Sequence, residues 1–427
     1  MDIRSLRDSL SNIDRGLNVL QAMVAPSSNG VTMVTAGTSI QSAIDRSYPG
    51  ATITVEPGTY SGVIRPWKPV TIQPTSPIPP GRPAGEGPVI ITSNGPDTVH
   101  VVGPDVNLRG LTVKNSVPDS QLYNITGPRC WLDRCVGLGD PINGQHRGIA
   151  ANGNTCLISQ CFIDECRLVG RDAQALMGWN GTRHLSVFDS YLSGGAEAVM
   201  FGGADPSSSD RTPEDIEIGR CTLTKKLTWY QLGVQIKNAF ECKNVRKLYM
   251  HDCVLEYAGT AEGQGAYPIV LTVRNQSGTA PYSTIEDVLI ERCAVRFGGG
   301  CVNILGSDGN NASMIMNRVT LRNILFESID PHGVTKGSGF CFLIQHWPDS
   351  MTFDGITVRG QNLTSGFYVV GAGKPAPARM VINNINIPAV LYPAKIDAGG
   401  AGWAALEAYM PDLKLNVVGP GATGVPS

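Results

Sequence analysis

Apolar residues within the first 24 positions are spaced alternately by three and four residues. This spacing is the a/d pattern of a coiled coil, in which an apolar stripe on one helix packs against a partner helix. It predicts a self-associating helical stem, and Leu at a positions with Ile at d positions favours more than two strands, so we expect a trimer. An amphipathic helix that packs along its own chain, or one that anchors the chain in a larger assembly, explains the same pattern. The stripe consists of Ile3, Leu6, Leu10, Ile13, Leu17, Leu20 and Val24.

A second pattern recurs along most of the remaining chain: an apolar residue, two residues, a small or apolar residue, one residue, and usually an apolar residue. It runs from LRGLTV at 108–113 to INNINI at 382–387. Short strands repeated at about 24 to 40 residues predict a solenoid, because each copy is too small to bury an apolar face alone. The fourth position of the pattern is expected to form a continuous interior ladder. Its residues are Leu111, Cys135, Cys161, Ser190, Cys221, Cys253, Cys293, Ile324, Ile356 and Ile385.

A further strand is expected after each copy, with loops of variable length at the turns. The expected second strands are 198–203, 234–238, 269–275, 302–308, 340–346 and 367–371. Glycine clusters between the strands supply turns.

The residues before the repeat, 38–60, read TSIQSAIDRSYPGATITVEPGTY. Ser39 is suited to cap a short helix that the following Pro-Gly ends, and such a helix would shield the open edge of the first coil. The apolar face of this helix consists of Ile40, Ala43 and Ile44. The segment resembles the opening of the pectate-lyase-like superfamily of right-handed parallel β-helices, a resemblance that implies a fold and not an activity.

Residues 234–360 also resemble a group of largely uncharacterised bacterial and phage β-helix proteins. The resemblance rests on VQIKNAFECKN (234–244), VLTVRNQSGTAPYS (270–283) and GGGCVNILGSD (298–308). It covers about a third of the chain, and no chemistry assigned to that group carries over to individual residues.

The expected fold is therefore all-β: a right-handed, single-stranded parallel β-helix with a short N-terminal, coiled-coil-like helical stem. We divide the chain into a stem or attachment segment (1–24), a linker (25–37), the capped β-helix of about ten to thirteen coils (38–400), and a C-terminal cap with its tail (401–427). In the last segment, 403–409 is expected to be helical and 413–418 to form a strand.

Composition narrows the classes of function. The net charge is −2 and the chain has 11 cysteines. This charge provides no basic field for nucleic acid, no segment has the length for membrane insertion, and no signal peptide is apparent. Five cysteines lie on the predicted interior ladder, so we interpret them as reduced packing residues. Their spacing does not match a metal site, and we expect neither a metal nor a cofactor.

Candidate chemistry lies where the expected second strands end. If the register is right, polar residues from five successive coils stack near one edge and form a strip suited to a sugar chain. Glu241, Lys237 and Arg274 are the catalytic candidates, because lyases need a base and hydrolases need carboxyl groups. Solvated strand ends that form hydrogen-bond ladders between coils explain the same residues. The candidate substrate-binding residues are Asp205, Asn238, Asn275, Asp308 and His346.

A solenoid with a helical stem is similar to phage tailspike proteins. This resemblance implies a trimeric receptor-binding protein of the virion tail, assembled in the host cytoplasm. Its β-helix would contact host surface polysaccharide, and its N-terminal helix would bind other virion proteins of the tail or portal adaptor. A polysaccharide lyase or glycoside hydrolase of the superfamily is the first alternative. A structural virion component without glycan binding is the second.

Overall fold

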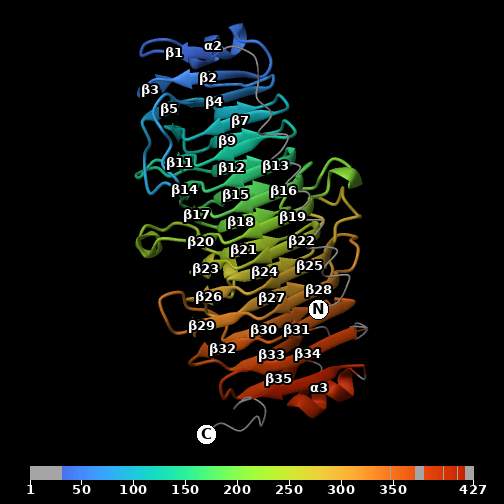
Figure 1. Ribbon diagram of the computed structural model, residues 1–427. Coiled ribbons are helices and arrows are strands. Elements are labelled where there is room, and N and C mark those ends of the chain that lie inside the picture. The colour runs from blue at the N-terminus through green and yellow to red at the C-terminus, as the bar shows by residue number, and fades with distance from the viewer. Residues whose placement is uncertain (1–30, 347, 371–378, 398, 411, 419–427) are drawn as a thin grey trace.

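The computed structural model describes residues 31–346, 348–370, 379–397, 399–410 and 412–418 (Figure 1). The predicted stem over 1–24 lies outside the described residues. Among those described, no helix is long and apolar enough to cross a bilayer. The strands form a 25-stranded sheet, sheet A, and a 12-stranded sheet, sheet B.

Sheet A consists of two sets of strands that follow each other in most coils. The first set is β1 (Val31–Val34), β2 (Ala51–Val55), β4 (Val70–Pro74), β7 (Val106–Arg109), β10 (Trp131–Asp133), β13 (Asn154–Ser159), β16 (Arg183–Phe188), β19 (Glu214–Gly219), β22 (Val245–His251), β25 (Ile285–Glu291), β28 (Asn317–Arg322), β31 (Ser350–Asp354), β34 (Arg379–Asn386) and β37 (Lys414–Val418). The second set is β3 (Gly58–Ser61), β5 (Val89–Ser93), β8 (Thr112–Asn115), β11 (Val136–Leu138), β14 (Phe162–Cys166), β17 (Tyr191–Gly194), β20 (Thr222–Thr224), β23 (Val254–Glu256), β26 (Ala294–Arg296), β29 (Leu325–Ile329) and β32 (Thr357–Gly360).

Sheet B supplies the third strand of most coils and faces the viewer in Figure 1. Its strands are β6 (Asp97–Val101), β9 (Gln121–Ile125), β12 (Arg147–Ala151), β15 (Gln174–Gly178), β18 (Glu197–Phe201), β21 (Asn238–Cys242), β24 (Ile269–Thr272), β27 (Val302–Leu305), β30 (Phe340–Gln345), β33 (Ser365–Val370), β35 (Tyr392–Ile396) and β36 (Gly400–Ala401). Equivalent strands of adjacent coils pair in parallel, for example β18 with β21, and only β36 pairs antiparallel among the described strands. The predicted parallel β-helix is confirmed.

A two-residue turn joins the first and second strand sets in most coils. The two turn residues are the third and fourth positions of the six-residue repeat seen in the sequence. The first turn residue has φ between +51° and +65° in ten coils. Such a backbone costs a non-glycine residue about 1–2 kcal/mol, and bonds between coils offset that cost. The Arg134 N–H, for example, donates to the Ser159 carbonyl at 2.9 Å. These first residues are Gly110, Arg134, Gln160, Asp189, Arg220, Asp252, Arg292, Asn323, Gly355 and Asn384.

The second turn residue is the fourth position of the repeat, and it is buried in every coil from Leu111 to Ile385. Its carbonyl accepts from the adjacent coil: Phe162 N–H donates to Cys135 and Tyr191 N–H to Cys161, both at 2.9 Å. All 11 cysteines are buried and unbridged. The predicted interior ladder is confirmed, and its cysteines serve as small packing residues.

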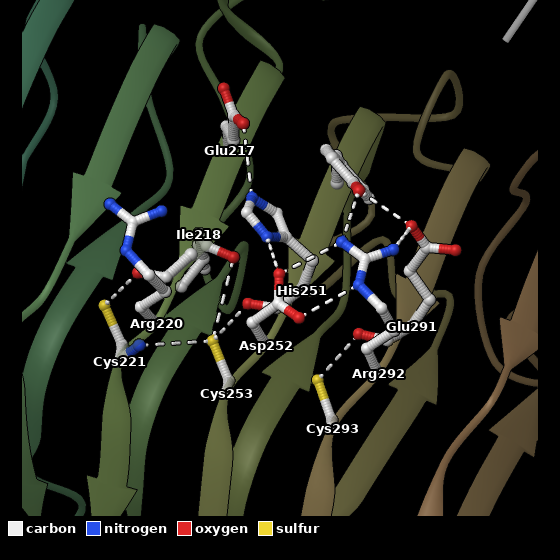
Figure 2. A network of polar contacts seen from close by, with 12 residues as sticks. Glu217, Ile218, Arg220, Cys221, His251, Asp252, Cys253, Glu291, Arg292 and Cys293 are labelled. Carbon is white, nitrogen blue, oxygen red and sulfur yellow. Dashed lines mark hydrogen bonds and ion pairs between the residues drawn. The ribbon is translucent and has the colours of Figure 1, made fainter. Parts of the chain in front are cut away.

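Charged side chains on the outer side of these turns pair between coils (Figure 2). Arg292 donates to both Asp252 oxygens, at 2.9 and 3.0 Å. His251 lies between Asp252 and Glu217, at 2.7 and 3.3 Å, and its ring stacks on Tyr249. Burial opposes the charged imidazole, but the two carboxylates outweigh it and raise the pKa of His251. The His251 contact with Glu217 and the Arg292 contact with Asp252 each join adjacent coils, so this network fastens the coils to one another.

Both ends of the solenoid have a helix. In α2 (Ile40–Arg46), the Ser39 side chain accepts from the Ser42 N–H and the predicted apolar face is buried, which confirms the capping helix. At the other end, α3 (Trp403–Tyr409) buries Leu406 and contacts β35. The strand β37 pairs in parallel with β34.

The solenoid begins earlier than predicted. The segment 25–37 was expected to be a linker, but β1 lies within it and pairs in parallel with β2. Val34 is buried against the capping helix and the first coil. The polar and small residues around β1 hid a strand whose partner lies about 20 residues away.

Loops leave sheet B along two edges. On the edge where its strands begin, the long loops are 167–173, 225–237 with η2 (Leu227–Gln231), and 257–268 with η3 (Ala261–Gly263). On the edge where they end, the long loops are 202–213 with η1 (Ser209–Arg211), 273–284 and 306–316. Figure 1 shows loops projecting from both sides of the sheet at the level of β18 and β21.

Candidate functional site

Polar side chains line the outer face of sheet B at the first position of three adjacent strands. Gln174, Glu197 and Asn238 are paired in register across β15, β18 and β21. The next residues, Ala175, Ala198 and Ala239, turn into the core, which Val199 and Phe240 also help to fill. Adjacent strands lie about 4.8 Å apart, so the three polar side chains are neighbours on one face.

Glu197 is the most perturbed carboxyl group on this face. Its side chain is only 1% exposed and accepts a hydrogen bond from Gln174 Nε2 at 2.8 Å. Burial, followed by the nearby negative charges of Glu241 and Asp172, raises its pKa to about 8. At neutral pH Glu197 is therefore mainly a protonated carboxylic acid, the form that a general acid requires.

Glu241 provides a second carboxyl group one strand further along. It is 5% exposed, and its Oε2 accepts from Asn238 Nδ2 at 2.5 Å. Lys243 Nζ lies 3.6 Å from Oε1. Because Asn238 is the register partner of Glu197, it stands between the two carboxyl groups and orients one of them.

A buried lysine lies behind this pair. Lys225 Nζ donates to the carbonyls of Gly194, Gly195 and Ala196 at 2.7 to 3.1 Å, in the tight turn before Glu197. Burial lowers its pKa to about 7, against the opposing effect of the nearby carboxylates, Glu197 first. Lys225 thus fixes the backbone from which Glu197 projects.

Three loops meet over the carboxyl pair through one ammonium group. Lys237 Nζ lies 2.7 Å from Asp172 and 2.6 Å from Glu262, so it joins loops 167–173, 225–237 and 257–268. Burial opposes its charge, but the hydrogen bonds to Asp172 and Glu262 raise its pKa well above the usual value. The side chain of Lys237 is 7% exposed, whereas that of Glu262 is 61% exposed. A charged, doubly paired Lys237 is unsuited to act as the base of a lyase.

The single strip expected from the sequence is wrong for Lys237 and Asn238. The segment 234–238 alternates like a strand, but the strand of this coil is β21, which starts at Asn238. Val234 and Ile236 pack on Trp229 of the 225–237 loop, outside the main core. Lys237 and Asn238 therefore lie where sheet B begins, beside Glu241, and not with the other candidates.

The remaining candidates lie beyond the opposite edge of the sheet, where the strands end. Arg274 pairs with Asp308 at 3.2 Å, and Asp308 also accepts from the Asn275 N–H at 2.8 Å. The Asp205 carboxylate accepts from the backbone N–H groups of Ser277 and Thr279 and from the Thr279 hydroxyl. His346 Nδ1 contacts the Ser307 carbonyl. These contacts fasten loops of successive coils, and the predicted catalytic and binding roles of this group stay predictions.

Sequence reasoning missed Glu197, Lys225 and Asp172. A signal for Glu197 was present, because the three strands read QALM (174–177), EAVM (197–200) and NAFE (238–241). Each has a polar residue, an alanine and an apolar residue in the same order. Aligning them would have placed Glu197 beside Asn238. Lys225 and Asp172 lie in loops that carry no repeat.

Two buried acceptors on the same face are free to take a ligand's donors. Gln174 Oε1 and Asn238 Oδ1 have no hydrogen-bond partner among the described residues. Leaving a buried acceptor unpaired costs about 1–3 kcal/mol, which a hydroxyl donor would offset. No cluster of His, Cys, Asp and Glu suited to a metal occurs within the described part of the chain.

Comparison with known proteins gives structural likeness alone. No protein-family model and no curated sequence matches the chain. An alginate lyase from Paenibacillus sp. str. FPU-7 superposes with a TM-score of 0.45 and 12% identity, over 83% of this chain and 99% of its own. The Dettilon tailspike protein superposes with a TM-score of 0.48 and 14% identity, over 84% of this chain and 68% of its own. The catalytic domain of a GH87 alpha-1,3-glucanase superposes with a TM-score of 0.49 and 12% identity, over 92% of this chain and 69% of its own.

The fold is a parallel β-helix. The strand pairing within the chain itself establishes this. Pectate lyase Pel9A is another structural neighbour, with a TM-score of 0.44 and 11% identity, over 72% of this chain and 78% of its own. Neighbours with these low identities bear different activities in their names, so what this β-helix does has to be argued from its own site.

Proposed function

We propose that this β-helix binds a polysaccharide across the outer face of sheet B and cleaves it by hydrolysis, with Glu197 and Glu241 as the two carboxyl groups. The observation that carries the proposal is the burial of Glu197 beside a second buried carboxyl group, Glu241, an arrangement that raises the pKa of Glu197 and favours its protonated form. Glycoside hydrolysis needs this combination: one group donates a proton while the other remains a carboxylate.

The roles follow from the surroundings of each group. Glu197 gives its proton to the glycosidic oxygen as the bond from that oxygen to the anomeric carbon breaks. Glu241, oriented by Asn238, either removes a proton from the attacking water or attacks the anomeric carbon itself, and the anomeric form of the product distinguishes these routes. The unpaired acceptors of Gln174 and Asn238 would take hydroxyl donors of the sugar.

Access to the pair involves the bridge at Lys237. Glu197 and Glu241 are nearly covered, so a sugar chain reaches them only when the bridge between the three loops opens. The exposed partner, Glu262, is the end that solvent and substrate reach first. Glu262 also has a left-handed backbone, φ +53°, which makes its loop conformation the less stable side of the bridge.

The test is incubation of the full chain with bacterial surface polysaccharides and assay of new reducing ends. Wild-type protein is expected to release oligosaccharides, and Glu197→Gln and Glu241→Gln to release none while still folding. Unsaturated products would show elimination and contradict hydrolysis. Activity that survives both substitutions would remove this pair from the mechanism.

The setting predicted from the sequence, a trimeric tailspike on a phage particle, is part of the proposal. Its support is the heptad stem, which lies outside the described residues, joined to a long solenoid. In that setting the solenoid contacts host polysaccharide and the stem binds other virion proteins. Co-sedimentation of the full chain with phage tails, lost on removal of residues 1–25, would support it.

A further inference from the structure

A cleft of about 690 Å³ lies on another face of the solenoid, away from the carboxyl pair. Its floor is the outer side of β3, β5, β8 and β11, in the second strand set of sheet A. Ser61, Thr92, Lys114 and Leu138 follow one another in register across these four strands. This volume is within the range of small-ligand sites, about 300–1,000 Å³.

One wall is formed by Glu86 of the loop 75–88, which leaves β4 and runs beside β5 to β14 (Figure 1, blue). Five of its 14 residues are proline, and it is held at several points. Gly87 N–H donates to Thr112 Oγ1 at 2.7 Å, and Arg134 Nη1 donates to the Ile78 and Pro79 carbonyls at 3.3 Å. A wall fixed in this way lowers the entropy cost of binding.

The charged groups of the cleft are already paired within the protein. Lys114 forms an ion pair with Glu86. Glu165 accepts from Arg167 at 2.8 Å and from Lys226 at 2.5 Å. Asp140 accepts two backbone N–H groups of its own turn. A charged ligand would have to disrupt these pairs.

The groups that remain for a ligand are uncharged. Within the described part of the chain, the Ser61 and Thr92 hydroxyls contact only each other, at 3.4 Å, and Thr92 also the Tyr60 carbonyl, at 3.5 Å, and these are weak hydrogen bonds. The Asn94 side-chain amide is exposed and has no hydrogen-bond partner among the described residues. Leu138 and Pro141 add apolar surface next to these groups. Hydroxyl and amide groups beside small apolar patches suit the alternating hydroxyl and C–H faces of a sugar ring.

We propose that this cleft is a second carbohydrate-binding site, for a short, neutral segment of glycan. It is separate from the carboxyl pair and requires no catalysis there. Its role would be to hold a polysaccharide on the solenoid while another part of the chain occupies sheet B.

The test uses the full chain with a filling variant and a matched control. Ser61→Trp places an indole in the cleft. Thr59→Trp adds the same group to an exposed position two residues earlier on β3, outside the cleft lining. Both are screened by saturation-transfer NMR against short neutral oligosaccharides of glucose, galactose, mannose and rhamnose, and the binders are measured by calorimetry.

At least one neutral oligosaccharide is expected to bind wild type. We expect Ser61→Trp to raise its Kd at least about tenfold, equivalent to about 1.4 kcal/mol, and Thr59→Trp and Glu197→Gln to leave it unchanged. Binding to none of the panel, or equal binding by Ser61→Trp, would overturn the second site. Loss of binding in Glu197→Gln but not in Ser61→Trp would place the sugar on sheet B, so the proposed function would stand and the second site would not.

Discussion

Replacing Glu197 by Gln should reveal how strongly this carboxyl group is held in its protonated form. The amide has nearly the same shape and does not titrate. The pKa of Glu197 rises from 4.5 to about 8 on folding. The folded state therefore binds this proton more tightly, and the stabilisation is fully present below about pH 4.5 and lost as the pH rises through about 8.

The size of the effect follows from that difference. At about 1.4 kcal/mol per pH unit, the full difference corresponds to about 5 kcal/mol. Lys225, whose pKa is also displaced, gains charge when Glu197 ionises and reduces the cost. We therefore expect Glu197→Gln to match wild type at about pH 5 and to exceed it by about 2–5 kcal/mol at about pH 9.

Amide hydrogen exchange is the suitable assay, because a solenoid unfolds locally as well as globally. Peptides from β15, β18 and β21 should exchange at least about thirtyfold more slowly in the variant at about pH 9, after correction for intrinsic rates. Glu407→Gln, on the exposed side of α3, controls for the charge change alone. The reasoning fails if the difference between variant and wild type is the same at both pH values, because Glu197 would then be ionised in the folded protein near neutral pH.

Four further predictions test other parts of the structure. Lys225→Met removes the ammonium donor from the Gly194, Gly195 and Ala196 carbonyls, of which Ala196 keeps backbone donors, so it should destabilise the β17–β18 turn by about 3 kcal/mol, measured by hydrogen exchange in that peptide; unchanged protection would refute the role. Glu262→Gln weakens the bridge at Lys237 and should raise the rate of polysaccharide cleavage severalfold, whereas an unchanged rate would show that the bridge does not limit access. His251 has a raised pKa, so its network should stabilise the turns fully below about pH 6.5 and lose that contribution as the pH rises through the folded value; His251→Gln should abolish this pH dependence in the exchange of β22 and β25. Deleting residues 1–25 should convert a trimer to a monomer by light scattering, and a trimer that persists would show that the heptads do not hold the assembly.

Much of the fold could be predicted from the sequence because the repeat is local. The turn residues from Gly110 to Gly355 and the ladder from Leu111 to Ile385 recur in a fixed order within six residues. Each copy has the same task, which is to reverse the chain and bury one small side chain. The capping role of Ser39 and the apolar face of α2 could be predicted for the same reason, since a helix cap is specified within four residues.

The candidate site was only partly predictable. Glu241 was a catalytic candidate from the sequence, and the structure places it on β21 of sheet B. Glu197, which the structure brings near it, lies 44 residues earlier in the chain and was not among the candidates. The error over 234–238 has a clear physical cause. Alternating apolar residues specify burial on one side and not what they are buried against, and here Val234 and Ile236 pack on Trp229 of their own loop.

The sequence alone thus determined the solenoid, its interior ladder and its capping helix, because these depend on contacts that each coil repeats with the next. The tertiary structure decided which polar residues meet. Glu197 and Glu241 come from two adjacent coils, Lys225 and Lys237 come from the long loop 225–237, and the raised pKa of Glu197 depends on its burial in this surrounding. A titration that arises from burial and from charges on other coils has no signature in any one segment of the chain.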